Sequence, residues 1–183
     1  MLRAVIVFFI AFLPLVASAA DDIIARQYRA EAYAKEIIEL RKTLAREYIK
    51  PGVEITPETF MQVCGAVGMR VKEIAEKEGF IIRHAAIKYR NPVNKATPEE
   101  AELIKNFVSE EEGVLDEWEL VERDGRSYFR YTVPIYVEEQ CLACHGRKEA
   151  RPQFIVEKYP DDRAYGFKAG DLRGIVSILM KEK

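Results

Sequence analysis

The stretch CLACHG at residues 141–146 contains two cysteines separated by two residues, with a histidine directly after the second cysteine. Cysteines at this spacing occur in redox disulfides, in zinc sites and at haem attachment points. In c-type attachment, the sulfur atoms of Cys141 and Cys144 would form thioether bonds with the two vinyl groups of the macrocycle, and His145 would coordinate the iron from one face. The position of the histidine therefore favours covalent haem binding.

Two other interpretations of the cysteines remain open. A thioredoxin-like disulfide would follow a strand in a βαβ unit, and the sequence around the motif predicts no such unit. A structural zinc site could use Cys64 with the three residues of the motif as a Cys3His set. Adjacent residues such as Cys144 and His145 project in different directions, however, and rarely bind one ion together. Haem is therefore the preferred interpretation, with zinc as the alternative.

The first 19 residues have the composition of a secretory signal peptide. Arg3 supplies an early positive charge, residues 4–16 are almost wholly apolar, and the small residues 17–19 suit a signal peptidase, so cleavage is expected after Ala19. The apolar run is too short for a comfortable membrane span and is interrupted by Pro14. We therefore expect a periplasmic protein with no membrane span after cleavage. Haem attachment of this type also takes place outside the cytoplasm, so the two signals agree.

Length and charge limit the classes of protein that fit. The chain has 183 residues, with 28 lysines and arginines against 30 aspartates and glutamates. Residues 20–183 fit a single domain with a hydrophobic core of ordinary size. A nearly neutral chain lacks the basic surface that phosphate binding needs, which argues against a nucleic-acid partner.

The N-terminal half of the chain predicts two helices. The first covers residues 22–50, which contain no proline or glycine, and ends at Pro51. The second begins with Thr56 as its N-cap and ends near Gly79. Its apolar residues recur at helical spacing, and Cys64 lies among them. We therefore expect the side chain of Cys64 to point into the protein.

A third helix and four strands complete the predicted elements. Thr97 and Glu100 form a capping box at the start of this helix, whose buried face is expected to extend to Val108 and which Gly113 closes. Asp124-Gly125 predicts a hairpin turn between two strands. The strands are expected at residues 80–89, 114–122, 127–135 and 173–180. This order predicts an α+β fold, with an antiparallel sheet flanked by helices and a long N-terminal helix. A PAS-like domain is one such arrangement.

The iron of a c-type haem has a second axial position, for which the chain offers few ligands. Met61, Met69 and Met180 remain after signal cleavage, as do Cys64 and His84. Cys64 is equally compatible with a small apolar core residue and with a thiolate ligand to ferric iron. His84 lies in a predicted strand and is the next candidate. The residues alone do not decide whether Cys64 is a core residue or an iron ligand, and His84 stays a candidate behind it.

The chain from about Phe60 to Met180 resembles a family of single-haem, PAS-like c-type domains that was long catalogued as a domain of unknown function. The family occurs as free cyanobacterial cytochromes and as extracytoplasmic sensor modules of chemoreceptors and kinases. The matching residues are Cys64, Arg83, RNPVN at 90–94, EAE at 100–102, Phe107, CLACHG at 141–146, Tyr159-Pro160, AYGF at 164–167 and GDLRG at 170–174.

This resemblance implies an iron held by His145 on one face and by Cys64 on the other. The chain departs from the family pattern at one place. The family often has small hydroxyl residues after the arginine that matches Arg83, where this chain has His84. His84 therefore remains the alternative ligand.

Two further expectations concern the pocket and the role of the protein. Haem propionates need cationic partners, for which Arg83 and Arg90 are the candidates. An iron with both axial positions filled suits electron transfer or redox sensing better than enzymatic catalysis. If CO or NO displaced Cys64, the protein would instead be a gas-responsive sensor. Because the chain ends at Lys183, shortly after its last strand, we expect it to work through a redox or signalling partner protein.

Overall fold

The computed structural model describes residues 13–109 and 117–182. The chain contains both helices and strands without a repeated strand-helix-strand order, which is typical of an α+β fold. The main elements are α1 (Leu13–Tyr48), α2 (Pro57–Phe60), the π-helical turn η1 (Met61–Gly65), α3 (Ala66–Glu78), β1 (Ile81–Ala85), α4 (Pro98–Ser109), β2 (Glu117–Arg123), β3 (Arg126–Tyr136), α5 (Leu142–His145), α6 (Gln153–Lys158) and β4 (Leu172–Lys181). Short 3-10 turns lie at Pro92–Asn94, Glu139–Cys141 and Lys148–Ala150.

The four strands form one antiparallel sheet in the order β1-β4-β3-β2. The predicted hairpin between β2 and β3 is confirmed. Asp124 and Gly125 have φ angles of 53° and 68°, as a two-residue turn with left-handed central residues requires. The last strand in the sequence, β4, lies between β1 and β3, so the sheet forms only when distant parts of the chain meet. The α+β fold with an antiparallel sheet and a long N-terminal helix is confirmed, while the PAS-like description stays a prediction.

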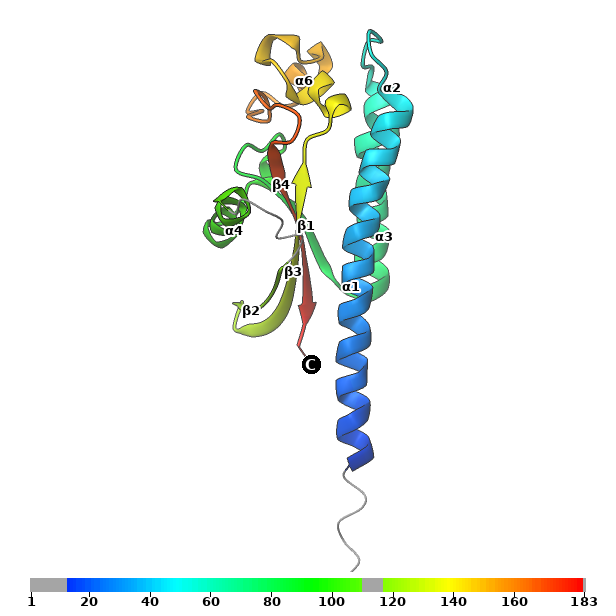
Figure 1. Ribbon diagram of the computed structural model, residues 1–183, viewed down its shortest axis with the longest axis vertical. Helices are drawn as coiled ribbons and strands as arrows, with labels where there is room; N and C mark the ends of the chain where they lie inside the picture. Colours follow the sequence, from blue (N-terminus) through cyan, green and yellow to red (C-terminus); the bar gives the residue numbers. More distant parts are fainter. Residues whose placement is uncertain (1–12, 110–116, 183) are drawn as a thin grey trace, which may run out of the picture.

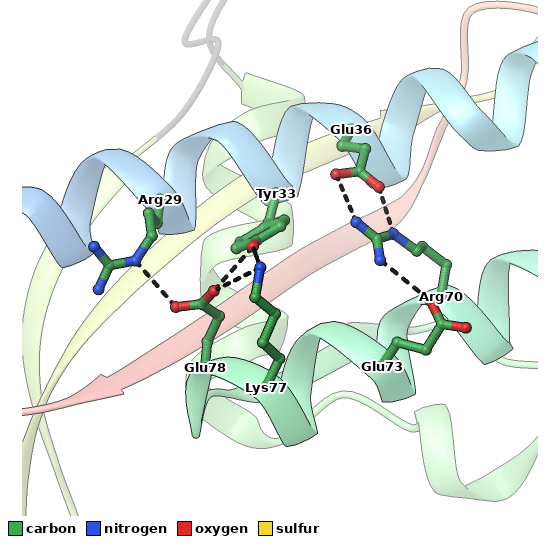
Figure 2. Close-up of polar contacts among 7 residues, drawn as sticks. All are labelled: Arg29, Tyr33, Glu36, Arg70, Glu73, Lys77 and Glu78. Atoms are coloured by element: carbon green, nitrogen blue, oxygen red, sulfur yellow. Dashed lines mark hydrogen bonds and ion pairs between the residues drawn. The ribbon is translucent and has the colours of Figure 1, made fainter.

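Helices α1 and α3 lie together on one face of the sheet, and α4 lies on the other (Figure 1). Ile37 of α1 and Ile74 of α3 pack with Tyr131 and Ile178 of the sheet in the main core. Beyond this core, polar side chains link α1 to α3 (Figure 2). Arg70 donates to both carboxylate oxygens of Glu36, at 2.6 and 3.2 Å. This ion pair is partly exposed, so it orients the two helices more than it stabilises the fold.

The N-terminal residues of α1 belong to the predicted signal peptide. Residues 13–19 continue α1, and residues 1–12 lie outside the described part of the chain. Cleavage after Ala19 and the start of the domain at residue 20 therefore stay predictions. Within residues 13–109 and 117–182, no helix combines the length and apolar character that a membrane span needs.

The structure differs from the predicted elements in a few places. The strand expected to reach residue 89 ends at Ala85, because the chain then turns through Asn91 and carries Arg90 into the interior. Val108 was expected to be buried but is 68% exposed, so that part of the prediction was wrong: the packed face of α4 ends with Phe107. Helix α6 was not predicted. Gly113 and the start of the predicted strand at 114 lie outside the described residues.

The capping box of α4 is confirmed and allows a stability prediction. The Glu100 amide donates to Thr97 Oγ1 at 3.2 Å, and the Thr97 amide donates to Glu100 Oε2 at 2.9 Å. Replacing Thr97 with alanine removes an acceptor for a helix N-terminal amide and should lower the free energy of unfolding by about 1 kcal/mol. Urea unfolding measures this change. Thr97→Ser retains the acceptor and should unfold nearly as the wild type does; equal losses in both variants would contradict the assignment.

Candidate functional site

A cavity of about 560 Å³ lies between α1, the helical segment from α2 to α3, and strands β1 and β4. A smaller cavity of about 70 Å³ shares lining residues with it. The residues common to both are Arg41, Cys64, His84, His145 and Arg173. Cys141 and Cys144 line the smaller cavity. The fold therefore brings all three cysteines and both histidines of the chain to one connected region.

His145 ends the short helix α5 and is held in one orientation. Its Nδ1 lies 2.7 Å from the carbonyl oxygen of Ala164. A carbonyl only accepts hydrogen bonds, so Nδ1 carries the proton and Nε2 keeps a free lone pair. Arg90 Nη2 lies 3.4 Å from the same nitrogen but donates to the Cys144 carbonyl at 2.6 Å. Burial, with Arg173 and Arg90 nearby, holds the pKa of His145 well below its usual value. The ring is therefore neutral, the form that binds a metal.

The loop at residues 162–167 positions the motif. The Gly166 amide donates to the Gly146 carbonyl at 2.6 Å, and the Phe167 amide donates to the His145 carbonyl at 3.1 Å. The Phe167 ring also packs edge-on against His145, with centroids 6.2 Å apart. The glycine of the motif is required by a close approach, because a Cβ at residue 146 would lie 2.6 Å from the Leu142 carbonyl oxygen.

Asp162 anchors this loop. Its side chain is fully buried and lies 2.9 Å from Arg151 Nη1 and 3.5 Å from Arg90 Nε. Its Oδ1 also accepts the Ala164 amide at 2.9 Å. The carboxylate thus connects two arginines to the residue whose carbonyl orients His145.

Cys141 and Cys144 are free thiols, as is Cys64. Burial raises the pKa of Cys141, and it raises the pKa of Cys144 to about 11. Both thiols are therefore protonated at neutral pH. Among the described residues, which include Cys64 and the motif, no group of three or more histidine, cysteine or acidic side chains could hold a metal ion. This geometry does not favour the Cys3His zinc alternative.

Cys64 is exposed, which corrects the expectation that it points into the protein. It lies in the π-helical turn η1 and lines both cavities. The expectation assumed a continuous α-helical period. A π turn contains an extra residue, which changes the phase of the side chains that follow. Val63 and Val67 are buried in the core, while Cys64 is directed into the cavity.

His84, on strand β1, also lines both cavities. Its Nε2 atom is buried and has no hydrogen-bond partner. Burial, with Arg41, Arg173 and His145 nearby, lowers its pKa well below the usual value, so this ring is neutral as well. Met61 and Met69 are largely exposed, and Met180 lies in the main core. None of these methionines lines either cavity.

The two predicted arginines occupy different environments. Arg83 lines the larger cavity, but its Nε and Nη2 donate to Glu100 at 2.9 and 3.2 Å, and Nη2 also donates to the Lys95 carbonyl. Arg90 is 7% exposed, and its Nε and Nη1 are buried without a hydrogen bond. Arg90 Nε faces Asp162, so Nη1 is the donor of Arg90 left for a bound group, whereas most of the donors of Arg83 are already used.

Sequence reasoning missed two further arginines at the cavity, Arg41 and Arg173. Each has a buried Nε without a hydrogen-bond partner. Burial, with Arg90 and Arg41 close by, lowers the pKa of Arg173 to about 9, a sign of crowded positive charge. Arg41 lies four residues after the buried Ile37, and Arg173 is the second residue of β4, which is mostly apolar. A charged residue at such positions was the available signal.

The chain resembles one solved structure over nearly its whole length. The crystal structure of the cyanobacterial haem-protein Tll0287 superposes with a TM-score of 0.69 and 33% sequence identity, covering 96% of this chain and 98% of the other. No curated protein sequence matches the chain. The family model of the Tll0287-like proteins matches residues 20–180, which agrees with the resemblance seen in the sequence. The chain therefore belongs to the Tll0287-like family.

Proposed function

We propose that this protein binds one haem c in the larger cavity and acts in electron transfer or redox sensing outside the cytoplasm. In this proposal, Cys141 and Cys144 carry the thioether bonds, His145 binds the iron on one face, and Cys64 binds it on the other. The observation that carries the proposal is that these four residues line two cavities with shared walls. The haem-protein Tll0287, similar over nearly its full length, supports the choice of haem.

The residues present fit such a group in size and in charge. A cavity of about 560 Å³ is in the range of cofactor pockets. Haem carries two carboxylates, and buried cationic groups need anionic partners. Three arginines line the larger cavity and have buried N–H groups without a hydrogen-bond partner: Arg41, Arg90 and Arg173. A bound group with negative charges would satisfy them, and Arg90 is one of the propionate partners expected from the sequence.

Haem would supply the one-electron chemistry, and the chain determines how accessible the iron is. His145 is neutral and fixed by Ala164, so its Nε2 is ready to coordinate. Cys64 would hold the iron together with His145, and an iron held by two protein ligands would suit electron transfer or redox sensing through a partner protein. The alternative role is a CO- or NO-responsive sensor, in which the gas displaces Cys64. Rapid CO binding to the reduced protein would favour that alternative.

Expression with export and a c-type haem maturation system tests the proposal. The purified protein should give the pyridine haemochrome spectrum of haem c and an intact mass increased by one haem, with residues 1–19 removed. The double variant Cys141→Ala/Cys144→Ala should lose all covalent haem, because both sulfur atoms are gone. Cys64→Ser, which keeps both thioethers, is the matched control and should retain it. A wild-type protein that carries zinc and no haem would refute the proposal.

A further inference from the structure

We propose that His84 is a second protein ligand for the iron and replaces Cys64 when the iron is reduced. This inference rests on the proposed function, because it presupposes haem in the larger cavity. It goes beyond that function by giving the opposite face of the iron two ligands, one for each oxidation state.

The first argument is the environment of His84. Its Nε2 is buried without a hydrogen-bond partner, although buried polar atoms are almost always paired. The side chain lines both cavities, as Cys64 and His145 do. A neutral imidazole nitrogen without a partner, in the cavity that receives the haem, is chemically a ligand for iron.

The second argument is that His84 and Cys64 lie in different kinds of local structure. His84 lies in β1, where it is opposite Val176 of β4, and slippage of the strand by one residue would turn the side chain to the other face. Cys64 lies in a single π-helical turn and is exposed on the cavity side. Such turns are uncommon insertions in α-helices and occur often at functional sites. The strand register therefore holds His84 in place, whereas the position of Cys64 depends on one local turn.

The third argument concerns what limits this movement. Helix α3 is tied to α1 from Arg70 onward (Figure 2). Arg70 binds Glu36, and Glu78 accepts hydrogen bonds from Arg29 and Tyr33 at 3.0 and 2.9 Å. These contacts hold α3 on α1, so an exchange at residue 64 requires a change only in the turn Met61–Gly65, where Val63 is buried and Cys64 is exposed.

The chemistry of the exchange is balanced. Ferric iron carries one more positive charge than ferrous iron, so the anionic thiolate of Cys64 binds the ferric form better. A one-electron donor, such as a reduced redox protein, supplies an electron to the iron. If the Cys64–iron bond broke, its electron pair would stay on sulfur, which would take a proton from solvent. Nε2 of His84, which is buried without a hydrogen-bond partner, would then offer its lone pair to the iron.

The test compares the spectra of His84→Ala and Cys64→Ser with those of the wild type, in the ferric protein and after reduction with dithionite. We expect each substitution to change the absorption and resonance Raman spectra of one oxidation state only. Cys64→Ser should change the ferric spectrum and leave the ferrous spectrum as in the wild type. His84→Ala should keep the ferric spectrum and lose the six-coordinate low-spin ferrous signal, which added imidazole should restore.

Met61→Leu is the matched control, because Met61 lies in the same π turn and carries another possible ligand. It should leave both spectra unchanged; loss of the ferrous low-spin signal in this variant would overturn the inference. An unchanged ferrous spectrum in His84→Ala would also overturn it. In that case the haemochrome assay still detects haem c, whereas failure of the proposed function abolishes the haemochrome itself. The unchanged ferric spectrum of His84→Ala shows that this variant folds and retains haem.

Discussion

Replacing Asp162 with alanine should destabilise the protein by about 3–5 kcal/mol, because two largely buried arginines lose the carboxylate that they share. The Asp162 side chain is fully buried and lies against Arg151 and Arg90, both of which remain in the variant. The change also removes the acceptor of the Ala164 amide. The Ala164 carbonyl orients His145, so under the proposed function the variant should still attach haem, with a spectrum that becomes heterogeneous. Urea unfolding measures the stability, and resonance Raman measures the spread of axial ligation.

Asp161→Ala is the matched control for this substitution. Asp161 is the preceding residue and is exposed, so its loss should change the free energy of unfolding by about 0.5 kcal/mol or less. Asp162→Asn should give an intermediate loss, because the amide oxygen still accepts the Ala164 amide while the charge is lost. If Asp162→Ala unfolded at the same urea concentration as Asp161→Ala, the carboxylate would not anchor the loop.

Replacing Gly174 with alanine should destabilise the fold by roughly 3 kcal/mol, because a new methyl group would meet fixed backbone. A Cβ at residue 174 would collide with the Ala85 carbonyl oxygen and would lie 3.1 Å from the Ala86 Cβ. The collision is at the end of β1, one residue after His84, and β4 carries Arg173 beside it. We therefore expect less haem per protein as well as a lower unfolding midpoint, measured by absorbance and by urea unfolding.

Gly170→Ala is the control that measures the cost of backbone strain without a steric collision. Gly170 has a φ of +87° and no heavy atom within 4 Å of an added Cβ, so its substitution should cost only the left-handed backbone penalty, about 1 kcal/mol. A loss in Gly174→Ala no larger than that in Gly170→Ala would mean that β1 and β4 move apart easily. In that case, the close approach of β1 and β4 would not determine the shape of this end of the cavity.

Local patterns in the sequence predicted the features that depend on neighbouring residues. The capping box of Thr97 and Glu100 is present, and the Asp124-Gly125 turn joins β2 and β3 as expected. Such features form within a few residues, so their chemistry is visible in a short stretch of chain. Predictions that assumed regular periodicity were less successful. The π turn changed the phase at Cys64, and Val108 extended the apolar face of α4 one residue too far.

The composition, the spacing of apolar residues and the order of the motifs were enough to predict the α+β fold and the family. The charged groups around the site could be identified only once the packing of distant segments was known. Arg41, Arg90 and Arg173 come from a helix, a loop and the last strand, and they meet because β4 inserts between β1 and β3 while α1 covers them. No local pattern encodes such a meeting, since it depends on contacts between residues far apart in the chain. The same packing leaves Nε2 of His84 without a partner at the cavity that Cys64 lines.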